Sequence, residues 1–512
     1  MTQRRPLVTA AVLAALVGPA TLLAQPSGAT NLPSDSASGP TNLRYKGVSI
    51  TPIGFFAAEA FYRQRTLQAD MPSSYNALPF THTAQGQISE FRGSARQSRL
   101  GVLGEGRLSQ VAVSGYFEGD FLSSGTSSNS NESNSYPFRV RQFWAQAAFK
   151  NGFTFTGGQM WSLLSPARAG IATRAEYIPS VIEAQYVPGF DWARQFGARV
   201  TYRANRNVAV AASLEEPQTT FTARGAVNPT VAVLNSQPGG GALNATANYS
   251  YDVAPDAIVK IAFDQPGVAH FELKALGRIF RDRIYTVIPG TTTTTTTGTT
   301  TTTTTTPATN GGATNYTTAA GGVGASLFLP IQKTVDIGLN ALYGRGIGRY
   351  GSSQIADATL NERGEVVPIR AAHGLATVDL HATPALDIYG YGGVEYAYRT
   401  AGVNSAGKGV GYGSPLLNNT GCETELLPTA TNGPATGTCN ADTRAVAQGA
   451  AGFWYRFYRG NRGTVQFGVQ YSHTERSTWS SNATAAAAAG GPRVQPLATD
   501  NMVFTSFRYY LP

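Results

Sequence analysis

Apolar and polar residues alternate along several stretches of the chain, most regularly over Ser109–Leu122. The apolar parity there is Val111, Val113, Phe117 and Phe121, and the polar parity is Gln110, Ser114, Glu118 and Asp120. A period of two residues is that of a β-strand with one apolar and one polar face. Such a strand fits the surface of a soluble sandwich or the wall of a transmembrane barrel with a watery lumen.

The same reasoning predicts sixteen strands along the chain. Their ranges are 46–66, 95–106, 108–122, 137–150, 152–164, 191–204, 207–216, 257–265, 268–281, 320–330, 333–346, 372–383, 385–400, 444–459, 462–477 and 498–511. Seven short turns join fourteen of them, all but the first and the last, in pairs, at Gly106–Arg107, Asn151, Asn205–Arg206, Gln265–Gly267, Ile331–Gln332, Pro384 and Gly460–Asn461.

Short turns and long loops alternate along this whole series of strands. A sandwich has no reason to place every long connection at one end, whereas an outer-membrane barrel has short periplasmic turns and long external loops. We therefore predict an all-β fold, a 16-stranded antiparallel transmembrane β-barrel with both chain termini on the periplasmic side.

The faces of the later strands follow the pattern expected for such a barrel. In 268–281, Phe271 and Leu273 oppose Glu272 and Lys274, and a basic residue on the lipid face would cost about 2–4 kcal/mol at mid-depth. The charged parity should therefore face the lumen. Aromatic residues near strand ends predict an interfacial girdle, with the members Tyr389, Tyr391, Trp454, Tyr455, Tyr458, Phe507, Tyr509 and Tyr510.

One early strand, 137–150, breaks the pattern. Gln142 and Gln146 fall on the parity of Val140 and Trp144, opposite the two arginines of the strand. Either a β-bulge shifts the register, or the outer face of this strand contacts protein instead of lipid. We favour the second explanation, which predicts a subunit interface at the N-terminal strands.

The N-terminus has the features of a secretory signal peptide. Arg4 and Arg5 precede an apolar run, and cleavage after Ala20 or Ala24 fits the small residues there. After residue 24 the sequence contains no run of about 18 apolar residues, which is the length that a membrane-spanning helix needs. The predicted organisation is a signal peptide over 1–24, a flexible periplasmic leader over 25–44 and the barrel over 45–512, exported to the outer membrane of a Gram-negative cell.

Composition agrees with a chain of many strands and turns. The 512 residues include 57 Gly, 24 Phe and 24 Tyr, and 13% are charged. The formal charge of +9 comes from scattered basic residues, which together with export argues against nucleic acid as a partner. Such a surface attracts anions, either lipid head groups, including lipopolysaccharide, or solutes.

Two segments stand out by composition. Cys422 and Cys439 lie in a Gly/Pro/Thr/Asn-rich segment of an exported chain, which predicts a disulfide worth about 3 kcal/mol by loop closure. A metal or redox pair would need a CxxC spacing or a neighbouring His. The tract 291–306 is almost pure threonine, and we predict a disordered insert in an external loop without any strand.

Enzyme motifs receive little support. Gly346–Gly351 matches GxGxxG but opens a polar loop with no helix behind it, so it fails as a dinucleotide site. The five histidines have no metal-ligand spacing, and no GxSxG is present. We predict no enzymatic activity, no cofactor and no metal.

A charge-selective constriction is the remaining candidate site, because such a filter needs ionisable side chains in a narrow part of the lumen. The long loop 165–190 is a candidate constriction loop, since it is long enough to fold inward. It supplies Arg168, Arg174, Glu176 and Glu183, and the inward parity of the wall supplies Arg99, Glu118, Asp120, Arg139, Arg141, Arg199 and Lys260. The alternative for Arg139 and Arg141 is a position at the external rim, facing water or lipopolysaccharide.

Several short motifs, in this order, resemble the DcaP-like trimeric porins. They are Ser98–Gly101 (SRLG), Phe117–Phe121 (FEGDF), Arg139–Arg141 (RVR), Gly158–Ser162 (GQMWS) and Arg194–Phe196 (RQF). The resemblance implies a sixteen-stranded barrel, three copies per assembly, and passage of small anionic solutes such as dicarboxylates. The predicted function is thus a passive outer-membrane diffusion channel. The alternative is a non-conducting barrel or β-rich surface protein whose long loops bind a partner.

Overall fold

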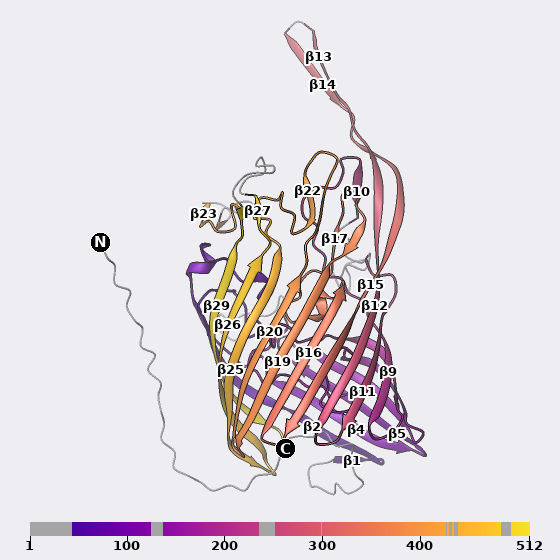
Figure 1. The fold of residues 1–512 in the computed structure, drawn as a ribbon, viewed down its shortest axis with the longest axis vertical. Coiled ribbons are helices and arrows are strands. Elements are labelled where there is room, and N and C mark those ends of the chain that lie inside the picture. Colours follow the sequence, from indigo (N-terminus) through magenta and orange to yellow (C-terminus); the bar gives the residue numbers. More distant parts are fainter. Residues whose placement is uncertain are drawn as a thin grey trace, which may run out of the picture.

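A computed structural model shows a closed antiparallel β-barrel of sixteen strands (Figure 1). It describes residues 43–123, 137–234, 251–297, 299–425, 428–429, 433–434, 439–482 and 493–512. The barrel strands are β2 Val48–Arg63, β4 Arg99–Leu108, β5 Val111–Asp120, β6 Arg139–Phe149, β7 Phe153–Trp161, β8 Arg194–Arg203, β9 Val208–Glu215, β11 Asp256–Gln265, β12 Ala269–Ile288, β15 Thr309–Ile331, β16 Val335–Arg345, β19 Arg370–Thr383, β20 Leu386–Ala397, β25 Thr443–Gly460, β26 Gly463–Thr478 and β29 Leu497–Tyr510. Pairing of β2 with both β4 and β29 closes the sheet.

Each of the sixteen predicted strands forms, and the alternation of connections is confirmed. Tight turns and the C-terminus lie at one end of the barrel, and the long loops lie at the other (Figure 1). One predicted turn, Gly106–Arg107, is misplaced by three residues. β4 continues through Leu108, and the chain reverses at Ser109 and Gln110, where Ser109 has a left-handed φ of 54°.

Short strands and 3-10 turns lie outside the sixteen barrel strands, either added to the main sheet or within the loops. β1 Leu43–Tyr45, β3 Glu90–Ser94 and β10 Val231–Val233 join the main sheet, and β17 Ala358–Leu360, β18 Val366–Pro368, β21 Thr400–Val403, β22 Gly409–Tyr412, β23 Pro428–Thr429, β24 Gly433–Pro434, β27 Ser481–Asn482 and β28 Arg493–Val494 form small hairpins in the loops. The 3-10 turns are η1 Tyr75–Ala77, η2 Gln85–Gln87 and η4 Gly348–Tyr350. Within the described ranges, no helix is long and apolar enough to cross a membrane.

The predicted faces of the strands are confirmed. On β12, Glu272 and Lys274 are buried in the lumen, whereas Leu273 between them is 46% exposed on the outside. On β5, Glu118 and Asp120 are likewise buried. The barrel therefore has an apolar outer skin and a polar interior, as lipid outside and water inside require.

The predicted aromatic girdle is wrong for four of its members. Tyr389, Tyr391 and Trp454 are buried inside the barrel, and Tyr510 lines an internal cavity. Tyr455 and Phe507 do lie on the outer surface. Strand alternation decides whether these aromatic side chains point into the lumen or toward lipid. Closeness to a strand end does not decide it.

A β-bulge explains the irregular strand 137–150. Gln142 pairs with Glu118 and Val140 pairs with Gly119, so Arg141 is the extra residue of β6. Arg141 and Gln142 consequently both point into the lumen and are both buried. The bulge, which was the less favoured explanation, therefore accounts for the parity of this strand. A subunit interface at the N-terminal strands and the homotrimer stay predictions.

The threonine tract is not strandless, contrary to the prediction. β12 and β15 continue past the barrel, and beyond them β13 Thr292–Thr297 pairs with β14 Thr300–Thr305 (Figure 1). Threonine is β-branched, and cross-strand hydroxyls approach each other, as at Thr296 and Thr301, 3.3 Å apart. High β-propensity thus outweighs the lack of any alternation in the tract.

The predicted disulfide is confirmed, because Cys422 and Cys439 are bonded in the loop between β20 and β25. The predicted signal peptide, 1–24, and most of the leader, 25–44, lie outside the described residues. The last two residues of the leader belong to β1, which pairs with β2.

The lipid-facing parity can be tested on β16. Leu339, in the middle of the strand, and Tyr343, near its loop end, are each 47% exposed on the outer surface. We expect L339R to lower the free energy of unfolding in lipid vesicles by about 2–4 kcal/mol and Y343R by about 0–1 kcal/mol. Urea titration followed by tryptophan fluorescence measures both, and equal costs would contradict the placement of Leu339 at mid-depth.

Candidate functional site

The loop between β7 and β8, residues 162–193, folds into the barrel and is called L3 here. Three cations of the wall hold the end of β7 and the beginning of L3 through backbone carbonyls. Arg199 donates to O of Trp161, the last residue of β7, at 2.6 Å, Lys274 to Leu164 O at 2.6 Å and Lys260 to Ser165 O at 2.7 Å. Charge-assisted hydrogen bonds of this kind are strong in a partly dry interior. The start of L3 is thereby fixed against β8, β11 and β12.

The middle and end of L3 are held by the opposite strands. The contacts are Tyr177 OH to Asp379 Oδ2 at 2.6 Å, Ser180 N to Tyr391 OH at 3.0 Å, Ile182 N to Gln470 Oε1 at 2.6 Å, and Gly189 N to Glu395 Oε1 at 2.8 Å. These partners are inward residues of β19, β20 and β26. L3 therefore crosses the lumen and lies flat against this part of the wall.

Glycines on the inner wall make room for L3. A Cβ on Gly393 would meet the Pro188 carbonyl oxygen at 1.9 Å, and a Cβ on Gly338 would meet the Tyr177 ring at 2.3 Å. Side chains at these two inward positions are thus incompatible with the observed path of L3.

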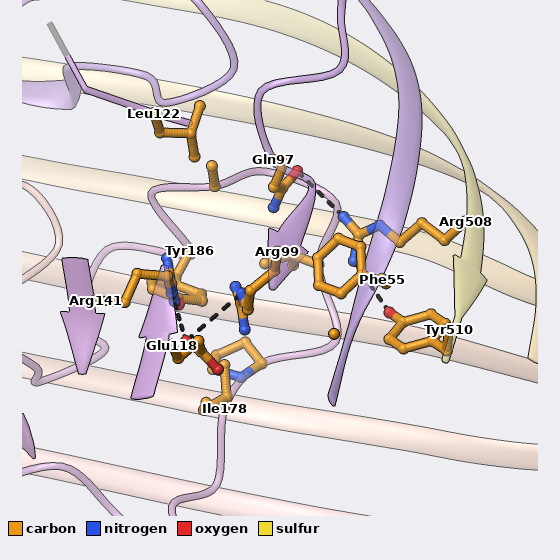
Figure 2. Close-up of a pocket in the computed structure, with 14 residues that line it drawn as sticks. Phe55, Gln97, Arg99, Glu118, Leu122, Arg141, Ile178, Tyr186, Arg508 and Tyr510 are labelled. Carbon is orange, nitrogen blue, oxygen red and sulfur yellow. Dashed lines mark hydrogen bonds and ion pairs between the residues drawn. The ribbon is translucent and has the colours of Figure 1, made fainter. Parts of the chain in front are cut away.

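A cavity of about 270 Å³ remains between L3 and the wall formed by β2, β4, β5, β6 and β29 (Figure 2). Three arginines line it, namely Arg99, Arg141 and Arg508. The other lining residues are Gly54, Phe55, Gln97, Glu118, Leu122, Ile178, Pro179, Val181, Ala184, Tyr186 and Tyr510. The cavity thus combines guanidinium groups on the wall with an apolar surface on L3.

Carboxylates on the same wall pair with these arginines. Arg141 contacts Glu118 and Asp120, each at 2.7 Å, and Arg139 contacts Asp120 at 2.8 Å. Arg99 lies 3.6 Å from Glu118 (Figure 2). The bulge in β6 makes this possible, because it turns Arg141 inward beside the acidic residues of β5.

Arg508 on β29 completes the group. It donates to Glu59 at 2.8 Å and to Gln97 at 3.2 Å, and its guanidinium lies over the rings of Phe55 and Trp454. Four arginines, three of them at the cavity, thus face three carboxylates. The wall carries a net positive charge.

The positive charge of these arginines affects the pKa of Tyr186 of L3. Its hydroxyl lies 3.4 Å from Nη2 of Arg141. Burial alone would raise the pKa of Tyr186, yet the pKa lies below its ordinary value because Arg141, Arg194 and Arg99 surround the hydroxyl. Positive charge in the cavity therefore outweighs the cost of burial for an anionic oxygen.

The structure brings part of the predicted site together. Of the eleven predicted residues, Arg99, Glu118 and Arg141 line the cavity, and Asp120 and Arg139 lie directly behind it. Arg199 and Lys260 do not reach it, because they are buried under the start of L3.

The four predicted site residues of L3, namely Arg168, Arg174, Glu176 and Glu183, lie apart from one another. Arg174 stacks over Tyr116 at 5.0 Å, and Arg168 lies over Tyr177 at 4.8 Å, near the turn end of the lumen. Glu176 is half-buried and its backbone pairs with Ala167. None of the four lines the cavity of Figure 2.

Glu183 is a structural anchor. It accepts hydrogen bonds from the Ser73 hydroxyl at 2.6 Å and from the Ser73 amide at 3.0 Å. Burial raises the pKa of this carboxyl, an effect that Arg63 and Ser73 only partly offset. Glu183 therefore ties L3 to the loop after β2 and does not contribute to the cavity.

Sequence reasoning missed Arg508. Its position was available from the parity of the last strand, because Val503 and Phe507 point outward and Arg508 therefore points inward. Its distance of more than 400 positions from Gln97 along the chain gave no signal that the two meet. Among the described residues, no cluster of three or more His, Cys, Asp or Glu could hold a metal ion.

The fold is that of the outer-membrane porins. Among solved structures, the outer membrane channel DcaP of Acinetobacter baumannii matches with a TM-score of 0.57 at 14% identity, covering 92% of this chain and 100% of that one. The chain thus has a DcaP-like porin fold.

Other solved barrels match less well. An anion-selective porin from Comamonas acidovorans has a TM-score of 0.45 at 10% identity, covering 91% of this chain and all of that one. OmpT, an outer membrane protein of Vibrio cholerae, has a TM-score of 0.43 at 11% identity, covering 92% and 99%. No protein-family model and no curated protein sequence matches the chain.

Substitution of two neighbouring glycines on β20 can test whether L3 packs directly against the inner wall. Gly393 faces L3, whereas a Cβ on Gly392 would meet nothing within 4 Å. We expect G393A to lower the free energy of unfolding by about 1–3 kcal/mol, because the loop must shift to admit the methyl group. Thermal or urea unfolding of the two variants in the same lipid checks this, and G392A should match the unmodified protein within about 0.5 kcal/mol.

Proposed function

We propose that the protein is a passive diffusion channel of the outer membrane for small hydrophilic solutes, with a preference for organic anions of the dicarboxylate type. The observation that carries this proposal is the cavity between L3 and the wall, with Arg99, Arg141 and Arg508 at its surface.

The width of the barrel supports a channel. Side chains fill the interior of barrels of about eight strands, whereas barrels of 16–18 strands leave an aqueous passage. L3 reduces that passage, and hydrogen bonds to several strands hold it in place. A fixed loop inside a wide barrel is what a size limit for solutes requires.

The charge of the cavity supports the preference for anions. Basic groups along a narrow passage raise the local concentration of anions. Because carboxylates neutralise most of the guanidinium charge, binding would be weak enough for a solute to leave, as conduction needs. The apolar side chains Ile178, Pro179 and Val181 on the L3 side suit a solute with a short hydrocarbon part.

Planar-bilayer recordings of the purified protein test the channel. We expect stepwise conductance, and a salt-gradient reversal potential that shows preference for chloride over potassium. Absence of conductance would instead favour the alternative, a barrel whose long loops bind a partner. Cation preference would refute the role given to the arginines.

Two substitutions with opposite expected effects test whether charge at the cavity sets the ion selectivity. We expect R99Q to lower the chloride-to-potassium permeability ratio by roughly two- to fivefold, and E118Q to raise it by a similar factor, because each removes one charge at the cavity. The matched control is K150Q, which removes a positive charge at the exposed turn after β6. If K150Q changed the ratio as much as R99Q, charge at the cavity would not set the selectivity.

A further inference from the structure

The lumen contains a second cavity with three arginines, at the turn end of the barrel. Its volume is about 180 Å³. Arg168 of L3, Arg203 at the end of β8 and Arg206 of the turn after β8 line it, together with Ala169, Gly170, Asp264, Gln265, Pro266, Gly267, Ala269, His270, Phe328 and Pro330. The first half of L3 borders this cavity, whereas the second half borders the cavity of Figure 2.

We propose that this second cavity is a separate binding station for small organic anions, which a solute occupies before or after the constriction. The inference rests on the proposed function, because a station in series has meaning only in a conducting lumen. It adds a site at which the solute is held between the constriction and the turn end.

L3 positions one guanidinium of the station. Gly170 has a left-handed φ of 58°, and a Cβ there would lie 2.7 Å from Nη2 of Arg203. The bare backbone of Gly170 thus leaves room for the Arg203 guanidinium to lie against L3. The long flexible side chain of Arg203, at the end of β8, is in this way held beside the lumen.

The acidic residue in the lining is already engaged. Both carboxylate oxygens of Asp264 accept from the Gly170 amide at 3.1 Å, and Oδ1 also contacts Nδ1 of His270 at 2.7 Å. Arg168 has its own partner, Asp336, at 3.6 Å. Three arginines and two carboxylates, those of Asp264 and Asp336, thus lie at this end of the lumen, and the surplus charge is positive.

The uncharged part of the lining points to an organic ligand. Phe328, Pro330 and Pro266 supply apolar surface beside the guanidiniums, and Arg168 lies over the Phe328 ring at 5.5 Å. A carboxylate on a short carbon chain could contact both kinds of surface. An inorganic dianion such as sulfate would gain only the charge.

Block of the potassium chloride current by succinate tests the station. The protein is inserted into a planar bilayer in one orientation, and succinate is added to one side at a time, with sulfate as the inorganic comparison. For the unmodified protein we expect block from either side, with succinate stronger than sulfate.

The double variant R203Q/R206Q removes from the station the two charges at the end of β8 and in the turn that follows it. We expect block by succinate from the turn side to weaken roughly tenfold, as loss of charge-assisted contacts implies, and block from the loop side to change less than twofold. K333Q, at the exposed turn after β15, removes charge from the same end without lining the cavity. It should leave both values unchanged.

The outcomes separate the two proposals. If R203Q/R206Q conducts but blocks like K333Q, the station does not exist, while the channel stands. If sulfate blocks as well as succinate, the site binds any dianion and the assignment to organic anions is wrong. If the unmodified protein fails to conduct, the channel proposal fails first and the station fails with it.

Discussion

Closure of the sheet between β2 and β29 is the constraint on which the rest of the structure depends. In a bilayer an unpaired strand edge would leave backbone amides and carbonyls without partners, so only a closed barrel can span it with strands. Once the sheet closes, strand alternation sends one set of side chains to lipid and the other to the lumen. The many charged residues then have a single place to go, and each must find a partner there.

The interior solves this problem by pairing charges with each other and with L3. On one side, arginines meet the carboxylates of β2 and β5. On the other, Arg199, Lys260 and Lys274 hold carbonyls of L3. The same side chains that satisfy the inner wall thus fix the loop that narrows the lumen. Two residues predicted for the filter, Arg199 and Lys260, therefore act as anchors of the loop.

The sequence allowed the strands and their faces to be predicted, because alternation and turn residues are local signals. It raised a bulge in the strand 137–150 as one of two explanations but could not decide for it, because the extra residue, Arg141, is defined only by the pairing of β6 with β5. Nor did it separate charges at the cavity from charges beneath L3, since Lys260 and Arg99 share an inward parity. That difference depends on where L3 lies, and glycines such as Gly393 decide this through contacts about 200 positions away.

The hydrogen bonds that hold L3 also bear on the order in which the barrel and the loop form. Ile182 is held by Gln470, a residue 288 positions later in the chain, on one of the last two barrel strands. Contacts so distant in sequence form late, after the costs of loop closure have been met. The narrow passage can therefore take shape only when the C-terminal strands are in the sheet. A barrel caught before that step would lack these contacts, and its lumen would be wider than that of the finished one.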